Sequence, residues 1–299
     1  MGREEKSFKS SLSDKVLSMS NRYAFYKREY ERLADENKNL KKDIQRLKAG
    51  HDDVDALKRN MNNSFYYLEG INVKFDREQQ YAFVFNDTIR ESEWLINKDF
   101  SLINAAANYS LAYSLYRILN DAQPKSILEL GLGQTTKITT QYVNHFDDAD
   151  LSVIEADQDW IDVFAEKLNV RDNADIIHRD LEIVDYKDKP TLRFKDLGDV
   201  VGDKKFDLII IDGPQGHLPG ESVDLDYPRT NILDLIPNNL ADDFIIIMDD
   251  YNRAGERNTM DDVEKLLKDN GIEFFEYTCN ALKSQHAVFS EKFKFISWI

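Results

Sequence analysis

From residue 126 to the end of the chain, short apolar runs alternate with longer segments of helical periodicity. Such alternation is typical of an open, mostly parallel sheet with helices on both faces. Ligands of these sheets bind beyond the carboxyl ends of the strands, near the point where the strand order reverses. The expected strands are residues 126–130, 151–155, 175–178, 206–211, 244–248, 273–277 and one or two strands near 286–295. The sequence therefore predicts an α/β fold with seven strands.

The first expected strand ends in ILELGLGQTT, where Glu129, Gly131 and Gly133 form an E-x-G-x-G turn. Glycines allow a tight turn and the close approach of a ligand, and the N-terminus of the following helix points toward that ligand. The third glycine of the dinucleotide fingerprint is absent because Thr136 occupies its place, which disfavours a nicotinamide cofactor. An acidic residue just before the glycines suits a cationic ligand.

Acidic residues also follow the next two expected strands. Glu155 ends the second strand, where a carboxylate can accept both hydroxyls of a ribose, and Asp180 follows the third, near the expected place of an adenine. Together with the later run FDLIIIDGPQG, this order and spacing resemble the class I S-adenosylmethionine-dependent methyltransferase family over roughly residues 100–299. The resemblance implies a Rossmann-like fold and S-adenosylmethionine bound at Glu129, Gly131, Gly133, Glu155 and Asp180.

Three further carboxylates follow the fourth and fifth strands: Asp212, Asp249 and Asp250. At adjacent strand ends they are expected in one crevice, where hard oxygen ligands could hold Mg²⁺ and so lower the pKa of an acceptor hydroxyl. Alternatively, Asp250 caps a helix or turn and Asp212 positions a loop. The pattern resembles metal-dependent catechol-type O-methyltransferases, although Asp249–Asp250 stands where that family has an Asp-Asn pair. Asp212 and Asp249 are the candidate catalytic carboxylates.

The stretch DGPQGHLPG, followed by Arg229, is similar to a D-G-P-x-G…R stretch in methyltransferases of polysaccharides, including those that act on glucuronic acid units of xylan. The resemblance implies a sugar hydroxyl as the acceptor. His217 is a candidate general base, or simply an exposed loop histidine. Arg229 and Arg253 are candidates to bind a carboxylate or phosphate of the acceptor, or are ion-pair residues of the surface.

Before this domain, apolar residues at alternating spacings of three and four continue over residues 12–61. Leucines 33, 40 and 47 fall at heptad position d, and Asn37 at an a position favours a parallel two-stranded register. The pattern predicts a long coiled-coil helix that Gly50 ends or interrupts; the alternative is a lone helix on the catalytic domain. The expected domains are an oligomerisation helix (1–61), a bridging segment (62–100) with a small strand pair or turn around Gly70, and the methyltransferase domain (101–299).

The net charge of −16 is unevenly distributed along the chain. Residues 1–61 carry 15 basic and 11 acidic residues, which leaves 24 basic and 44 acidic residues in the remainder. This excess of negative charge would repel a nucleic-acid backbone, which disfavours a nucleic-acid partner. The chain contains no apolar run long enough to span a bilayer and no signal peptide at its start, so a cytoplasmic location is expected. The single cysteine, Cys279, excludes an internal disulfide.

These features favour an S-adenosylmethionine-dependent O-methyltransferase that acts on a sugar or glycan, with Mg²⁺ as a candidate metal. We expect a homo-oligomer, with a dimer favoured, or docking of the coiled coil to a glycan-assembly complex. One alternative is a small-molecule O-methyltransferase acting on a phenol, catechol or natural product. Another is a non-catalytic coiled-coil scaffold with a cofactor-binding domain.

Overall fold

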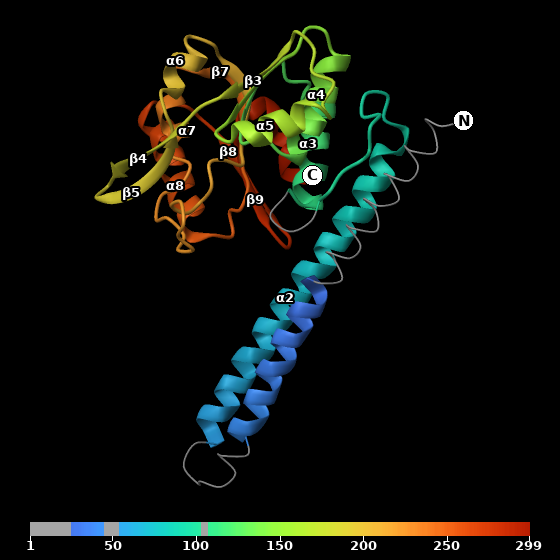
Figure 1. Cartoon of the computed structure of the whole chain (residues 1–299), viewed down its shortest axis with the longest axis vertical. Coiled ribbons are helices and arrows are strands. Elements are labelled where there is room, and N and C mark those ends of the chain that lie inside the picture. The colour runs from blue at the N-terminus through green and yellow to red at the C-terminus, as the bar shows by residue number, and fades with distance from the viewer. Residues whose placement is uncertain (1–24, 45–53, 103–106) are drawn as a thin grey trace. The chain divides into compact units, whose positions relative to one another are not determined.

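The computed structural model describes residues 25–44, 54–102 and 107–299 (Figure 1). The chain divides into two compact units, Met1–Val73 and Lys74–Ile299, and each is considered by itself. Among the described residues, no helix combines the length and the apolar character needed to span a membrane.

The first unit is helical wherever the structure describes it. Residues 25–44 form one helix, and α2 (Val54–Thr88) starts in this unit and continues into the second. The strand pair or turn expected around Gly70 is therefore wrong: this segment lacks proline, and one glycine costs a helix only about 1 kcal/mol. Gly50 lies outside the described residues, so the heptad register through residues 12–61 stays a prediction.

The second unit contains the seven-stranded, mostly parallel sheet that the sequence predicts (Figure 1). Its strand order is β3-β2-β1-β6-β7-β9-β8; the first five strands are parallel, β9 is antiparallel to β7, and β8 is antiparallel to β9. The strands are β1 (Ser126–Leu130), β2 (Asp150–Glu155), β3 (Ala174–His178), β6 (Phe206–Ile211), β7 (Leu240–Met248), β8 (Phe275–Asn280) and β9 (Ser284–Phe289).

Apolar side chains alternate between the two faces of this sheet and form two cores. Along β6, Leu208 and Ile210 belong to one core, whereas Ile209 and Ile211 belong to the other. A parallel sheet buried on both faces requires such continuous apolar runs. The helices of the first core are α3 (Tyr109–Ala122), α4 (Gln134–His145) and α5 (Gln158–Ala165); those of the second are α6 (Leu197–Val201), α7 (Asn231–Leu235) and α8 (Ala254–Asp269). The short 3₁₀ helices are η1 (Ile89–Glu91) and η2 (Glu291–Trp298).

Two local features stand out. Helix α3 begins at Tyr109, where the Asn108 side chain caps it by accepting a hydrogen bond from the Leu111 amide. A separate hairpin of β4 (Leu181–Tyr186) and β5 (Lys189–Phe194) was not predicted at all. Its two turn residues are Lys187 and Asp188, both at positive φ, and they lack the Asn-Gly or Asp-Gly signature of such turns.

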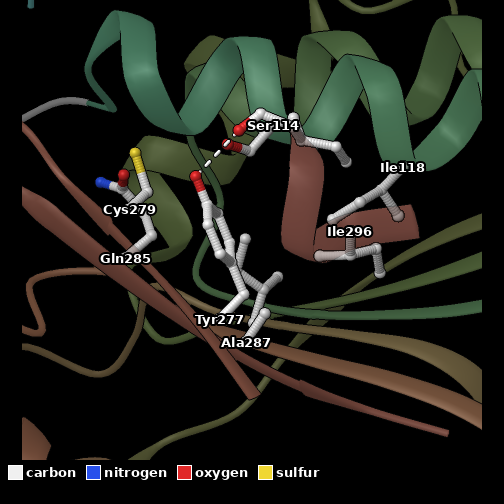
Figure 2. Close-up of a pocket in the computed structure, with 9 residues that line it drawn as sticks. Ser114, Ile118, Tyr277, Cys279, Gln285, Ala287 and Ile296 are labelled. Carbon is white, nitrogen blue, oxygen red and sulfur yellow. Dashed lines mark hydrogen bonds between the residues drawn. The ribbon is translucent and has the colours of Figure 1, made fainter. Parts of the chain in front are cut away.

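A small, mainly apolar cavity lies between α3 and the β8–β9 pair (Figure 2). Tyr277 of β8 extends across it, and its hydroxyl donates a hydrogen bond to the main-chain oxygen of Ile299 at 2.8 Å. Ser114 of α3 also borders the cavity, and its buried hydroxyl has no hydrogen-bond partner within the described chain. The hydrogen bond from Tyr277 thus helps to hold Ile299 against the sheet, and the side chains that line the cavity are uncharged.

Candidate active site

The strand order reverses between β1 and β6, and two glycines meet at the carboxyl ends of these strands. Gly131 has a φ of +103°, and a Cβ there would lie 3.0 Å from the Gly213 nitrogen. A Cβ on Gly213 would in turn lie 2.9 Å from the Gly131 Cα. Neither position therefore has room for a side chain. The backbones of the two loops are in close contact at the place where such sheets bind ligands. The D-G-P run, which carried the resemblance to methyltransferases, was also the sequence signal for Gly213, but no role was predicted for this glycine.

Glu129, in β1 just before the glycine turn, is fully buried. Its carboxylate oxygens accept hydrogen bonds from the hydroxyls of Thr135, Thr136 and Thr139, all in the first turns of α4. Burial raises the pKa of Glu129 to about 7, although the three hydroxyl bonds act in the opposite direction. The structure thus places Glu129 against α4 rather than facing a ligand, and its side chain holds the glycine turn onto that helix.

Gly133, the N-cap residue of α4, borders open space instead. A Cβ at Gly133 would meet no atom within 4 Å, and its amide donates a hydrogen bond to the Thr136 hydroxyl at 3.0 Å. Trp160 of α5, which the sequence analysis missed, approaches the same turn. Its indole donates a hydrogen bond to the Leu132 carbonyl at 2.9 Å, while 41% of the residue stays exposed. An aromatic side chain therefore stands at the rim of the turn.

Glu155, at the end of β2, is half-buried and held by backbone amides. One carboxylate oxygen accepts from the Leu132 amide at 2.9 Å, and the other accepts from the amides of Ala156 and Asp157. These bonds fix the side chain at the glycine turn before any ligand is bound. Asp180, beyond the end of β3, is different, because its side chain is 82% exposed.

Asp212, Asp249 and Asp250 do come together at the ends of β6 and β7. One oxygen from each carboxylate lies within 4.8 Å of the others. Asp249 and Asp250 are buried, whereas the Asp212 side chain keeps 20% of its surface exposed. The backbone sets this arrangement, because Met248 pairs with Ile211 and the Asp249 amide donates to the Ile211 carbonyl at 3.0 Å.

Two cations occupy the neighbourhood of these carboxylates. The Arg229 guanidinium is 2.9 Å from Asp250 and 3.6 Å from Asp212, and it also donates to the Asp249 carbonyl. Lys283, in the β8–β9 turn, places its ammonium 3.4 Å from Asp249 and 3.3 Å from Asp250. Sequence reasoning missed Lys283, because nothing local marks a lysine in a distant hairpin as a neighbour of β7.

This charge arrangement does not fit the Mg²⁺ ion expected at the three carboxylates. Two cations already neutralise most of their charge, and Mg²⁺ would need the same oxygens together with several waters. The structure also changes the role expected for Arg229. Its side chain is only 3% exposed and bonds the loops around it, so it cannot reach an acceptor.

The pKa values of the cluster follow from its burial and its charges. Burial and the neighbouring Asp249 charge raise the pKa of Asp212 to about 8, against the opposing effect of Arg229. Burial alone would raise the pKa of Asp250, but the charges of Arg229, Lys283 and Arg253 together hold that pKa below its usual range. The carboxylates raise the pKa of Lys283 despite its burial. The cluster therefore contains one carboxyl group that titrates near neutral pH.

A hydrogen-bonded chain connects the cluster to α3. Gln285 of β9 donates to Asp249 at 2.8 Å and to the Asn108 side chain at 3.1 Å, and it accepts from the Ser110 hydroxyl at 2.8 Å. Asn108 in turn donates to Glu78 of α2 at 2.7 Å. These hydrogen bonds hold the Asp249 side chain in place. The sequence could not predict them, because their residues form no recognisable motif.

The remaining candidates lie around the cluster. Arg253, the residue before α8, is 33% exposed in its side chain and lies 3.3 Å from Asp250. His217 forms an isolated bridge with Asp224, and its ring contacts the Leu218 carbonyl. Over the described part of the chain, no hydrogen bond or ion pair connects His217 with the three carboxylates.

Comparison with solved structures finds methyltransferases. An O-methyltransferase from Bacillus cereus, in complex with S-adenosylhomocysteine, is 14% identical with a TM-score of 0.48, over 74% of this chain and 100% of that one. The O-methyltransferase TomG from Streptomyces achromogenes, involved in tomaymycin synthesis, is 14% identical with a TM-score of 0.45, over 73% of this chain and 98% of that one.

The methyltransferase PaMTH1 from Podospora anserina, with S-adenosylhomocysteine bound, is also 14% identical, with a TM-score of 0.45 over 70% of this chain and 94% of that one. No protein-family model and no curated protein matches the sequence. At these identities and TM-scores, the likeness assigns no activity to this chain, and the function is inferred from the site residues.

Proposed function

We propose that the second unit is an S-adenosylmethionine-dependent O-methyltransferase that acts on a hydroxyl of a sugar or glycan. The observation that supports this most is the carboxylate–cation cluster beside the Gly131–Gly213 contact, at the place where the strand order reverses. Burying three carboxylates is costly unless cations pair with them. A module that only binds ligand needs no carboxyl group whose pKa lies near neutral pH, whereas an enzyme can use one for proton transfer.

The cofactor is proposed to bind along the carboxyl ends of β1, β2 and β3. Gly131 and Gly133 provide the close backbone approach, Glu155 accepts hydrogen bonds from the ribose, and Asp180 lies near the adenine. Glu129 contributes indirectly, by holding the turn through its three threonines. When bound, S-adenosylmethionine supplies a methyl group on a positively charged sulfur, and an acidic site suits that charge.

Asp212 is proposed as the general base. Asp212 is the most exposed of the three clustered carboxylates, so an acceptor can reach it. Its pKa of about 8 suits proton transfer near neutral pH. Asp212 would take the hydroxyl proton as the acceptor oxygen bonds to the methyl carbon, while the bond from that carbon to sulfur breaks and S-adenosylhomocysteine leaves. Asp249 and Asp250 hold Lys283, whose ammonium can stabilise negative charge developing on that oxygen. His217 is the weaker candidate, because nothing links it to the cluster.

The acceptor follows from the same arrangement. Binding a catechol through both hydroxyls needs a metal, which these residues do not fit, whereas a single sugar hydroxyl needs only a base and a position. Arg253 is proposed to bind a carboxylate or phosphate on the acceptor, since about a third of its side chain stays exposed. This proposal also rests on the resemblance of DGPQGHLPG to polysaccharide methyltransferases.

The first unit is proposed to mediate self-association. Aromatic side chains there are unusually exposed: Tyr30 (74%), Phe65 (74%), Tyr66 (72%) and Tyr67 (67%). Apolar surface of this extent is typical of interaction sites. Sedimentation equilibrium of the full chain tests this proposal, which predicts a dimer that Tyr66→Glu weakens.

The activity is tested by measuring S-adenosylhomocysteine release with three acceptor sets: uronic acid oligosaccharides, neutral sugars and catechols, each with EDTA and with Mg²⁺. We expect turnover on sugars that added Mg²⁺ leaves unchanged. Turnover restricted to catechols and dependent on Mg²⁺ would contradict the proposed acceptor and mechanism. Cofactor binding without turnover on any set would instead support the scaffold alternative.

A further inference from the structure

A second group of metal-ligand side chains lies on the sheet face that α8 covers. It consists of Glu264 on α8, Glu276 on β8 and His286 on β9, with one ligand atom from each within 4.8 Å of the others. Thr278 pairs with His286 across the β8–β9 ladder, and Glu276 lies two residues earlier on the same face of β8. Three separate elements therefore bring these side chains together.

His286 is the residue that points to a ligand. It is 3% exposed, and its Nε2 atom has no hydrogen-bond partner within the described chain. The other ring nitrogen, Nδ1, lies 2.8 Å from the Thr278 hydroxyl, and the ring stacks on Tyr251 at 4.4 Å. A buried nitrogen without a partner is destabilising, and a bound ion would remove that cost.

The distance between His286 and Glu264 also fits an ion. Nε2 and the Glu264 carboxylate oxygen are 3.4 Å apart, beyond the usual range of a hydrogen bond. Two ligands of a tetrahedral zinc ion, each about 2.0–2.2 Å from the metal, lie roughly 3.4 Å from each other. The pair is therefore spaced like two corners of such a coordination shell.

We propose that Glu264, Glu276 and His286 bind Zn²⁺, with water completing the tetrahedron. Nδ1–H of His286 donates to the Thr278 hydroxyl, which leaves the Nε2 lone pair for the metal. An imidazole ligand selects a transition metal over Mg²⁺. The Lys268 ammonium lies 3.3 Å from the second Glu264 oxygen, so the first oxygen stays directed at His286.

The ion would join α8 to the β8–β9 pair. Because His286 pairs with Met248, the residue before Asp249, zinc would stabilise the register that positions the cluster of the candidate active site. The inference goes beyond methyl transfer and holds whether or not the chain transfers methyl groups.

The test is calorimetric titration of the chelator-treated full-length protein with Zn²⁺, together with Co²⁺ absorption spectra and thermal melting. We expect one zinc ion per chain, a higher melting temperature with zinc, and tetrahedral Co²⁺ bands. Glu276→Gln should weaken zinc binding by more than about tenfold, and Thr278→Val by about 10- to 100-fold. Glu276 is exposed, so its substitution should leave the metal-free melting temperature unchanged.

Two controls locate the ion. Glu273→Gln changes an exposed glutamate just before β8 and should leave zinc binding unchanged. Asp249→Asn should also retain it, which separates this group from the Asp212–Asp249–Asp250 cluster. The proposal is overturned if the wild type binds no zinc, if Glu276→Gln binds it as tightly as the wild type, or if Asp249→Asn abolishes binding.

Discussion

Two groups of acidic side chains lie on the sheet of the second unit, and they differ in what surrounds them. The Asp212–Asp249–Asp250 cluster is contacted by Arg229 and Lys283, whereas the Glu264–Glu276–His286 group contains a buried nitrogen without a partner. In the first cluster two cations of the chain reach all three carboxylates, whereas in the second group Lys268 contacts Glu264. We therefore expect neighbouring charges, rather than the number of carboxylates, to determine whether such a group binds a metal.

The largest effect is expected from Asp212→Asn, which removes the proposed base from the first cluster. We expect kcat to fall about 100- to 10,000-fold. In the wild type, kcat should rise with pH through about 8, because Asp212 must lose its proton before it can accept another. The variant should lack this rise. A pH–rate profile measures both effects, and an unchanged inflection in the variant would assign the base to another residue.

Arg229→Met breaks the built-in neutralisation. It leaves Asp212 and Asp250 without their buried partner, so the free energy of unfolding should fall by about 3–5 kcal/mol. Urea denaturation measures this change. Arg253→Met is the matched control, because Arg253 contacts Asp250 from a partly exposed position and should cost about 1 kcal/mol or less. Equal losses in the two variants would contradict the account.

Glu129 extends the comparison to a carboxyl group that is buried with hydroxyl partners alone. Its folded-state pKa of about 7 lies above the ordinary value of 4.5, so the folded protein binds an extra proton between these pH values. This group's stabilisation is therefore complete below about pH 4.5 and is lost as the pH rises through about 7, a change of about 3 kcal/mol.

Glu129→Gln cannot ionise, so its unfolding free energy relative to the wild type should increase between pH 5 and pH 8. Urea denaturation at both pH values measures the difference, and Glu182→Gln, at an exposed position of β4, should show none. A wild type and Glu129→Gln that lose stability in parallel with pH would show that Glu129 is ionised at pH 5 already.

Lys283→Gln should make the first group resemble the second. With one cation removed, the three carboxylates should acquire affinity for Mg²⁺, which would stabilise the variant on the order of 1 kcal/mol at a concentration near ten times its Kd. Thermal melting with and without Mg²⁺ measures this. The exposed Lys268→Gln should show no such gain, and a Mg²⁺ effect in the wild type would mean that its cluster already binds the ion.

The sequence predicted the sheet well because continuous apolar runs are a strong local signal. Runs such as FDLIII required burial on both faces, and β6 begins and ends where it was predicted. The β4–β5 hairpin was missed because it is exposed and its Lys-Asp turn has no glycine. The helix through Gly70 was missed because one glycine was weighted above the helical character of its neighbours.

The positions of Glu155 and Asp212 could be predicted because one ends a strand and the other directly follows one. The residues that decide their charge state could not, because Lys283 and Gln285 reach Asp249 from a hairpin that is distant in sequence. Arg229 was recognised as important, but burial, which a motif does not reveal, gives it a structural role. The pairing of charges is a tertiary property.

The most direct test of the central claim is titration calorimetry with S-adenosylhomocysteine on the wild type and on Glu155→Ala. Glu155 is held in place by three backbone amides at the glycine turn. We expect binding by the wild type that added Mg²⁺ leaves unchanged, and a loss of at least about tenfold in Glu155→Ala, the equivalent of about 1.4 kcal/mol. A wild type that binds no S-adenosylhomocysteine, or a variant that binds it equally well, would contradict the cofactor site.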